Sequence, residues 1–255
     1  MHTAIHRFVW HDLNTTDVAA AEAFYGNVFG WTANAHDPHY KMWQNGEKGL
    51  GGVCVLKEEA KAMGAPPHWL AYVGVADAAA TVAKAESLGA RVYVPATAIP
   101  QVGRFAVIAD PTGAVFAVYE SARELGEQPQ AGVGDFSWGE LYTGDVDAAW
   151  AFYSGLFGWE KDDMDMGEMG MYRLFKNPDM GTLHMGGMCG FPPGMPPHPA
   201  WLYYASVADI HATVATVKSL GGQVLNGPME VPGGDLIAQC LDPQGAAFAL
   251  HQRPA

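Results

Sequence analysis

The feature that most constrains the fold of this chain is an internal repeat. The stretch AFYGNVFGW at residues 23–31 returns almost unchanged as AFYSGLFGW at residues 151–159. Two later segments of the first half, WLAYVGVAD and DPTGAVFAV, also have close counterparts further along, WLYYASVAD and DPQGAAFAL. Repetition this extensive indicates two homologous halves that fold alike.

The repeat predicts two domains joined by a short linker. The stretch SARELGEQPQAGVGD has no counterpart, is polar and contains glycine and proline, so we interpret it as the linker. We expect one domain at residues 1–120, the linker at 121–135 and the second domain at 136–255. With 255 residues in all, each domain is long enough to bury a core of its own.

A shorter repeat divides each half again. Four Ala-rich segments begin with Asp and end with Gly, at residues 17–30, 77–89, 145–158 and 209–221. Aspartate caps the free N–H groups of a first helical turn, and glycine closes a helix in the left-handed conformation. Each segment follows one β-like run and precedes several more, separated by turns. The sequence therefore predicts an α+β fold of four βαβββ units, two in each half.

These motifs resemble a known superfamily. Paired βαβββ units, the pattern D-x-x-x-A-x-x-FY-x-x-x-FGW and the closing DP-x-G-x-x-F strand are similar to the vicinal oxygen chelate superfamily. Its members include glyoxalase I, extradiol dioxygenases and bleomycin-resistance proteins, and the resemblance covers almost the whole chain as a tandem, two-domain glyoxalase-like protein. It implies that paired units curl into cups that hold a ligand, and that the two domains pair within one chain.

The resemblance also gives a test for metal binding. Metal-dependent members hold a divalent ion through His or Glu on the first, fifth and last strands. The matching positions here are Trp10, Leu70 and Ala117 in the first half and Trp138, Leu202 and Ala249 in the second. Indole, leucine and alanine side chains do not ligate a divalent ion. We therefore expect no metal at the usual place and no cofactor; a relocated site at His68, His184 or His198 is the alternative.

Other side chains take the place of the metal ligands in the expected cups. Alternation along the first strand of each half puts an indole and an acid on one face: Trp10 with Asp12, and Trp138 with Glu140 and Tyr142. A step of two residues along the other strands adds Tyr72 and Tyr119 in the first half, and Tyr204 and His251 in the second. We expect these aromatic residues and His251 to bind a ligand, unless the two indoles fill the cups, and Asp12 and Glu140 to be the candidate acid–base residues.

Charge and composition limit the partners. The formal net charge of −13 disfavours nucleic acid, and no apolar run is long enough to cross a bilayer. Three cysteines without a CxxC pair fit a cytoplasmic protein. We expect a small-molecule ligand as partner, with a homodimer possible.

Several functions fit these observations. The first is capture of an aromatic or cationic small molecule, as in bleomycin-resistance proteins. The alternatives are a glyoxalase- or dioxygenase-type enzyme with relocated metal ligands, a metal-free acid–base enzyme using Asp12 or Glu140, and a non-catalytic structural or partner-binding protein.

Overall fold

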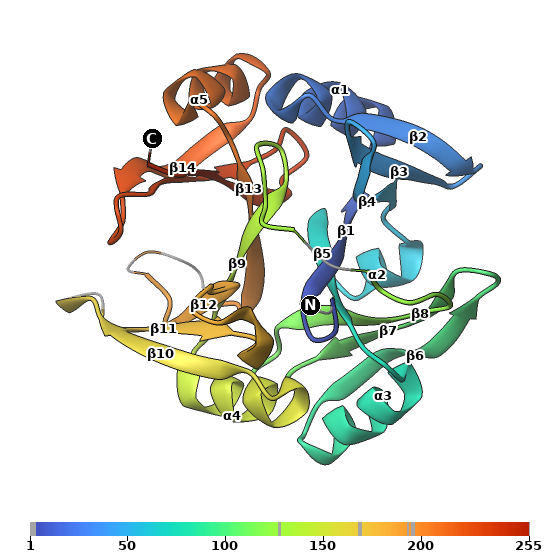
Figure 1. Cartoon of the computed structure of the whole chain (residues 1–255). Helices are drawn as coiled ribbons and strands as arrows, with labels where there is room; N and C mark the ends of the chain where they lie inside the picture. Colours follow the sequence, from blue (N-terminus) through green and yellow to red (C-terminus); the bar gives the residue numbers. More distant parts are fainter. Residues whose placement is uncertain (1–3, 127–128, 168–169, 193, 195–196, 255) are drawn as a thin grey trace. The chain divides into compact units, whose positions relative to one another are not determined.

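The computed structural model describes residues 4–126, 129–167, 170–192, 194 and 197–254. The fold is α+β, with two eight-stranded mixed sheets built from four βαβββ modules, as the sequence predicts (Figure 1). Every helix in these residues is too short or too polar to cross a membrane.

The first half of the chain holds two modules joined by a short helix, α2 (Glu58–Ala62). The first module consists of β1 (Phe8–Thr15), α1 (Val18–Phe29), β2 (Thr32–Asp37), β3 (Tyr40–Asn45) and β4 (Lys48–Val55). The second module consists of β5 (His68–Gly74), α3 (Ala78–Ser87), β6 (Arg91–Ile99), β7 (Gly103–Ala109) and β8 (Val115–Ser121).

The second half repeats this order and adds a 3-10 turn, η2 (Pro178–Met180). The third module consists of β9 (Phe136–Tyr142), α4 (Val146–Phe157), β10 (Glu160–Asp165), β11 (Met171–Lys176) and β12 (Gly186–Cys189). The fourth module consists of β13 (Ala200–Ser206), α5 (Ile210–Ser219), β14 (Gln223–Glu230), β15 (Leu236–Leu241) and β16 (Ala247–Gln252).

Strand pairing is the same in both halves. The strand orders are β2-β3-β4-β1-β5-β8-β7-β6 and β10-β11-β12-β9-β13-β16-β15-β14. In every module the first strand pairs in parallel with the fourth, while the outer strands form antiparallel pairs. A parallel pair needs a crossover connection, and the helix of each module lies in that connection.

The predicted helix caps are confirmed. Asp17 begins α1 by accepting a hydrogen bond from the backbone N–H of Ala20 at 3.0 Å, and Gly30 ends it with a φ of 75°. Aspartates cap the other three long helices in the same way. In α3 and α5, however, a leucine occupies the C-cap, and the left-handed glycine follows one residue later.

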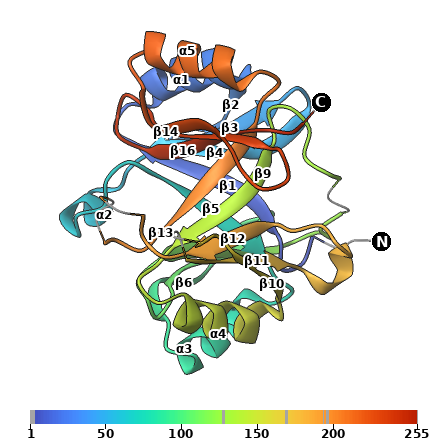
Figure 2. The ribbon, with the colours of Figure 1, turned by 90° about the vertical axis from the view of Figure 1, so that its left-hand side faces the viewer.

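Tertiary contacts divide the chain into two compact units that do not coincide with its two halves. Unit 1 contains residues 1–9, 71–129 and 138–201, and unit 2 contains residues 10–70, 130–137 and 202–255. The second module thus packs with the third, and the first with the fourth. Figure 2 shows the pairs of helices that result, α1 beside α5 and α3 beside α4.

The repeated FY…FGW motif provides the packing of unit 2. The rings of Phe24, Tyr25 and Phe29 lie 5.8, 5.4 and 6.0 Å from the ring of Phe248 on β16. The Tyr25 hydroxyl also donates a hydrogen bond of 3.1 Å to the buried carboxylate of Asp242. One aromatic face of α1 is therefore buried against the fourth module.

The second copy of the motif packs unit 1 in the same way. The rings of Phe152, Tyr153 and Phe157 on α4 lie 6.1, 5.3 and 6.0 Å from the ring of Phe116 on β8. The Lys84 ammonium at the end of α3 donates a hydrogen bond of 3.0 Å to the Leu156 carbonyl oxygen, at the end of α4. Each copy of the motif thus covers a strand of the other half.

The tryptophan that ends each motif makes a matching hydrogen bond. Trp31 Nε1 donates to the Gly134 carbonyl oxygen at 2.7 Å, and Trp159 Nε1 donates to the His6 carbonyl oxygen at 2.8 Å. Both acceptors lie two residues before the first strand of the other half. Each indole therefore fixes the start of the strand that carries a predicted Trp–acid pair.

Removal of the Phe248 ring tests this packing. Phe248→Ala is expected to lower the free energy of unfolding by about 3–5 kcal/mol, because a nearly fully buried ring is replaced by a cavity. Urea denaturation measures the change. The exposed Leu225 on β14 offers a control, since Leu225→Ala should stay within about 0.5 kcal/mol of the parent. Similar values for the two variants would contradict this account of the fold.

A buried histidine predicts that unit 2 loses stability in acid. His11 is 6% exposed and stacks on Phe136, with ring centroids 3.8 Å apart. Burial lowers the pKa of His11 from 6.5 to about 3. The unfolded chain therefore binds a proton that the folded chain does not, and stability falls as the pH drops from about 6.5 towards 3.

Substitution of this histidine should flatten the pH profile. His11→Phe keeps an aromatic ring against Phe136 but cannot be protonated, so its melting temperature should fall less than that of the parent between pH 7 and pH 5. Differential scanning calorimetry at the two pH values measures the difference. His211→Gln, at an exposed position of α5, should keep the parental profile.

Candidate functional site

Asp12, a predicted acid–base residue, accepts a hydrogen bond from a tyrosine on β3. Trp10 Nε1 donates to the Tyr40 hydroxyl at 2.8 Å, and that hydroxyl donates to Asp12 Oδ1 at 2.7 Å. Asp12 is 7% exposed, whereas Trp10 is only partly buried. We call this group of three side chains the Tyr40 bridge.

The third module contains an equivalent group. Trp138 Nε1 donates to the Tyr172 hydroxyl at 3.1 Å, and that hydroxyl donates to Glu140 Oε1 at 2.8 Å. The Tyr142 hydroxyl donates to the other oxygen, Glu140 Oε2. Glu140 is 6% exposed. We call these four side chains the Tyr172 bridge.

Glycines on the neighbouring strand make room for both tyrosine rings. Asp12 pairs with Gly52 on β4, and Glu140 pairs with Gly187 on β12. A Cβ atom on Gly52 would lie 2.0 Å from the Tyr40 ring and hydroxyl, and one on Gly187 would lie 2.2 Å from those of Tyr172. Each tyrosine can therefore lie across the strand and reach the acid only because the residue beneath it has no side chain.

The environment keeps both bridging hydroxyls protonated. Burial raises the pKa of Tyr40 and of Tyr172 well above the ordinary value, and the adjacent carboxylate raises each further. At neutral pH each tyrosine thus donates a hydrogen bond and does not act as a base. Burial similarly raises the pKa of the neighbouring Cys54 to about 11, so this thiol is not a nucleophile at neutral pH.

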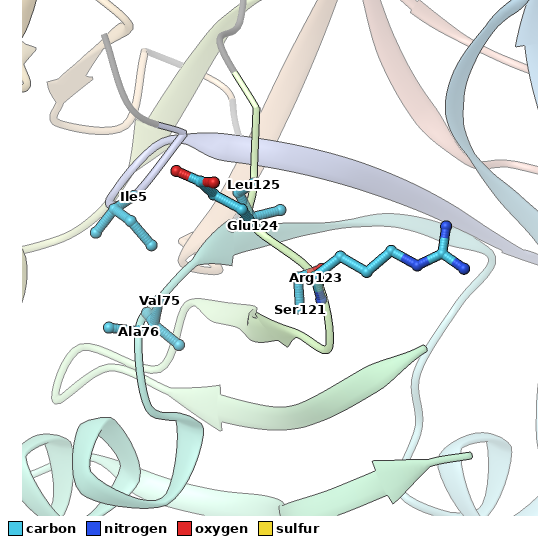
Figure 3. A pocket seen from close by; sticks show the side chains of 7 residues that line it. All are labelled: Ile5, Val75, Ala76, Ser121, Arg123, Glu124 and Leu125. Carbon is cyan, nitrogen blue, oxygen red and sulfur yellow. Dashed lines mark hydrogen bonds between the residues drawn. The ribbon is translucent and has the colours of Figure 1, made fainter. Parts of the chain in front are cut away.

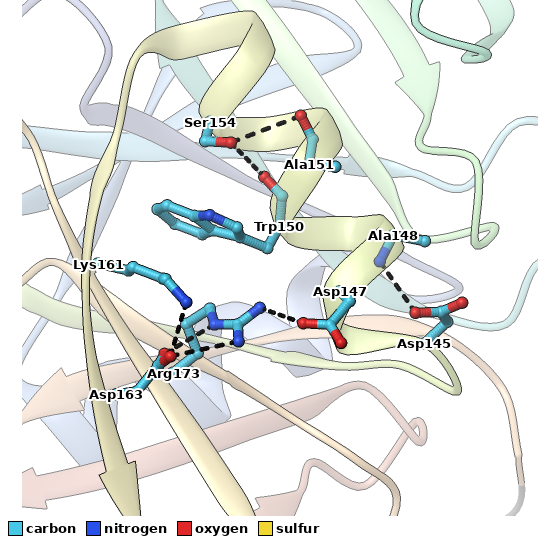
Figure 4. Close-up of polar contacts among 9 residues, drawn as sticks. All are labelled: Asp145, Asp147, Ala148, Trp150, Ala151, Ser154, Lys161, Asp163 and Arg173. Atoms are coloured by element: carbon cyan, nitrogen blue, oxygen red, sulfur yellow. Dashed lines mark hydrogen bonds and ion pairs between the residues drawn. The ribbon is translucent and has the colours of Figure 1, made fainter.

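An ion-pair network holds the strand that carries Tyr172. Arg173, the next residue on β11, places its guanidinium between Asp163 and Asp147, with contacts of 2.8 Å to each (Figure 4). Its guanidinium carbon also lies 5.9 Å from the centre of the Trp150 ring. Successive side chains of a strand point to opposite faces. These contacts therefore fix β11 against α4 from the face opposite the Tyr172 bridge.

The two units group the predicted residues across the halves of the chain. Unit 2 contains the Tyr40 bridge together with Tyr204 and His251, whereas unit 1 contains the Tyr172 bridge together with Tyr72 and Tyr119. The sequence pattern instead suggested that each half forms its own cup. The difference arises because the aromatic face of each FY…FGW helix packs on a strand of the other half.

The remaining predicted ligand-binding residues have defined surroundings. The Tyr72 ring lies 6.3 Å from that of Phe105, and the Tyr119 hydroxyl donates a hydrogen bond of 2.9 Å to the Val102 carbonyl oxygen. The Tyr204 hydroxyl accepts a hydrogen bond of 3.2 Å from Gln239.

Sequence reasoning missed both bridging tyrosines. Tyr40 and Tyr172 begin the matched stretches YKMW and YRLF, and each precedes a Gly-Gly pair followed by a Cys two residues later. An alignment of the repeats pairs the two tyrosines but gives no sign that they reach a strand other than their immediate neighbour. Only the space above Gly52 and Gly187 shows this.

The side chains present do not fit the divalent ion of metal-dependent relatives. The positions that the resemblance assigns to the metal ligands carry indole, leucine and alanine in both halves. Within the residues that the structure describes, three or more His, Cys, Asp or Glu side chains nowhere gather in a group that could hold a metal. The histidines considered for a relocated metal site have other surroundings. His68 Nδ1 contacts the Pro66 carbonyl oxygen at 2.7 Å, His184 pairs with Asp162, and His198 is exposed.

A small surface cavity of about 230 Å³ lies in unit 1, outside both bridges (Figure 3). Its lining combines apolar side chains with one hydroxyl and two charged side chains. It is lined by Ile5, Val75, Ala76, Ser121, Arg123, Glu124 and Leu125. None of the predicted site residues belongs to this lining.

Comparison with known proteins identifies the family. Residues 135–250 match the Glyoxalase/Bleomycin resistance protein/Dioxygenase superfamily, and residues 9–119 match a glyoxalase-like domain. The chain belongs to the vicinal oxygen chelate superfamily. It carries two of the superfamily's domains in tandem.

Two relatives match this vicinal oxygen chelate protein over most of its length. It is 36% identical over 255 residues to CFP32 of Mycobacterium bovis, which is provisionally named a glyoxylase, covering 94% of this chain and 92% of the relative. It is 31% identical over 269 residues to the anthracycline biosynthesis protein DauV of a Streptomyces species, covering 94% and 91%.

Solved structures share the fold at low identity. The Mn(II)-bound glyoxalase from Novosphingobium aromaticivorans superposes with a TM-score of 0.69 at 15% identity, covering 98% of this chain and 83% of the other. An extradiol ring-cleaving dioxygenase from B. fuscum gives a TM-score of 0.71 at 15% identity, covering 99% and 73%. At such identities the likeness shows the architecture and not the activity.

A single added methyl group tests the geometry of the Tyr172 bridge. Gly187→Ala is expected to lower the free energy of unfolding by about 1–3 kcal/mol, because the Tyr172 ring must move and Glu140 then loses a buried donor. Chemical denaturation measures the change. The matched control is Gly190→Ala, just beyond the same strand, where a Cβ atom meets nothing within 4 Å. A cost as large for the control would contradict the proposed role of Gly187.

Proposed function

We propose that this vicinal oxygen chelate protein binds an aromatic or cationic small molecule at its two tyrosine bridges, without the divalent ion of metal-dependent relatives. The observation that carries the proposal is that Trp10 and Trp138, at the positions that the resemblance assigns to the first metal ligand, each have an N–H fixed by a tyrosine bound to a buried acid.

The fixed indoles supply a binding surface. Trp10 and Trp138 are both only partly buried, and each N–H group is already hydrogen-bonded. An indole held in this way presents the face of its ring to a ligand. Ring faces attract aromatic systems by stacking and cations through the ring quadrupole.

The carboxylates supply charge next to each indole. Asp12 and Glu140 are almost fully buried, and the whole chain has a formal net charge of −13. A negative charge near the indole favours a cationic ligand over an anionic one. Tyr72, Tyr119, Tyr204 and His251 complete the set of side chains that we assign to ligand binding in the two units.

A relative points to the same ligand class. DauV is named as an anthracycline biosynthesis protein, and anthracyclines contain fused aromatic rings. Stacking on indole suits such a ring system. We therefore include an anthracycline among the first ligands to test.

The Tyr172 bridge also favours a second candidate function, metal-free acid–base catalysis. Glu140 accepts hydrogen bonds from two tyrosine hydroxyls, those of Tyr142 and Tyr172. A carboxylate is a group that can act as a general base. In this alternative Glu140, and Asp12 in the other unit, removes a proton from the bound molecule.

Calorimetric titration tests ligand binding directly. We expect an anthracycline and a quaternary ammonium compound to be bound equally well with and without EDTA. Trp10→Leu and Trp138→Leu should each weaken binding to the affected unit about tenfold, equivalent to about 1.4 kcal/mol. Leu225 on β14 is exposed and lies outside both bridges, so Leu225→Ala should leave the affinity unchanged. Binding that appears only after a divalent ion is added would overturn the proposal.

The fate of the ligand separates the two functions. If the protein only captures its ligand, mass spectrometry should recover the bound molecule unchanged after prolonged incubation. If Glu140 is a catalytic base, Glu140→Gln should abolish conversion of the ligand while its dissociation constant changes by no more than a few-fold.

A further inference from the structure

A serine, a histidine and an aspartate from three separate segments meet in unit 2. Ser137 lies on β9, His251 on β16, and Asp235 in the turn before β15. Ser137 Oγ is 2.9 Å from His251 Nδ1, and His251 Nε2 is 3.4 Å from Asp235 Oδ2. The histidine therefore lies between a hydroxyl and a carboxylate, as in an acid–base relay that activates a nucleophile.

The carboxylate determines which ring nitrogen can accept a proton. A proton on Nε2 faces the Asp235 carboxylate, whereas a lone pair there would be repelled by it. The neutral imidazole therefore carries its proton on Nε2 and presents the Nδ1 lone pair to the Ser137 hydroxyl. The other acceptor near this hydroxyl, the Tyr204 carbonyl oxygen, is more distant at 3.3 Å.

The surroundings keep this histidine neutral. Burial lowers the pKa of His251, with a smaller opposing effect from Asp235 and a further lowering from Arg253. A neutral imidazole can take a proton at physiological pH. Ser137 is only partly buried, so molecules from solvent can reach it.

The first half of the chain lacks all three groups at the matching places. The repeat aligns Ser137 with Val9, His251 with Tyr119, and Asp235 with Gly103. The strand register confirms the last two matches, because Phe105 pairs with Tyr119 as Ile237 pairs with His251. The fold therefore does not require a polar residue at any of these positions.

We propose that Ser137 is a nucleophile activated by His251 and positioned through Asp235, and that it reacts with small carboxylic esters. Ser137 Oγ forms a bond to the carbonyl carbon while its proton passes to His251 Nδ1. The ester C–O bond then breaks, and the leaving alcohol takes that proton. A water molecule hydrolyses the resulting acyl-serine by the same proton transfers. This activity goes beyond the binding function proposed above: it shares His251 with the residues assigned to ligand binding but needs neither tyrosine bridge.

A fluorophosphonate probe tests the nucleophile without knowledge of the natural ester. The serine oxygen forms a bond to phosphorus, fluoride leaves, and the protein gains one probe mass. We expect intact-mass spectrometry to show a single adduct, and peptide mapping to place it on Ser137. Ser137→Ala should remove it, and His251→Gln should slow labelling at least a hundredfold, within the range typical of general-base assistance.

The positioning residue and the repeat provide sharper comparisons. Asp235→Asn should slow labelling about tenfold and alter its dependence on pH, because the amide no longer fixes the histidine proton on Nε2. In the parent, the labelling rate should rise with pH and level off at a lower pH than it would for an ordinary histidine, because the pKa of His251 is lowered by burial. The double variant Val9→Ser with Ser137→Ala moves the serine to the matching position of the first half. It should stay unlabelled, because Tyr119 stands in the first half where the second has His251. His184→Gln, which alters the separate His184–Asp162 pair, should react like the parent.

The outcomes separate clearly. The absence of any adduct on the folded parent protein would overturn the proposal. So would an adduct that persists in Ser137→Ala or forms at an unchanged rate in His251→Gln. Circular dichroism of each variant confirms its fold, and if Ser137→Ala does not fold, the rates of Asp235→Asn and His251→Gln decide the question. Variants of the bridges, Trp10→Leu and Trp138→Leu, should lose anthracycline affinity but keep the labelling rate of Ser137. The two proposals can therefore fail independently.

Discussion

The rest of this structure depends on the burial of one aromatic helix face against a strand from the other half of the chain. Phe24, Tyr25 and Phe29 close around Phe248, and their counterparts close around Phe116. One contact joins the first and fourth modules, at opposite ends of the sequence, and the other joins the second and third modules across the linker. Because rings of this size contribute much of the apolar area in a core, they decide which modules form a compact unit.

Both tyrosine bridges depend on the same backbone repeat, yet they differ chemically. The shared parts are an indole two residues before an acid, a tyrosine from the third strand and a glycine on the fourth. The Tyr172 bridge has a longer acid and a second tyrosine donor, Tyr142. Duplication thus supplied one geometry, and substitutions within it gave two sites with different polarity.

The group formed by Ser137, His251 and Asp235 differs between the two halves even more than the bridges do. Three positions that are apolar, aromatic or glycine in the first half are all polar in the second, and they meet around one imidazole. Elsewhere the polar groups with a fixed role in the backbone, such as the exposed Asp17 and Asp145 caps, match each other closely. Backbone-determined roles are therefore preserved between the halves, whereas side-chain chemistry varies where the fold permits it.

The sequence by itself determined the modules: their number, order, helix caps and family follow from local patterns of aspartate, glycine and aromatic residues, which act within a few residues of their own position. It also placed Trp10 with Asp12 and Trp138 with Glu140 on common strand faces. Only the tertiary structure decided which modules pack together and that Tyr40 and Tyr172 reach those acids. Such contacts depend on ring packing and on the space above a glycine, which join residues far apart in the sequence and leave no local periodicity.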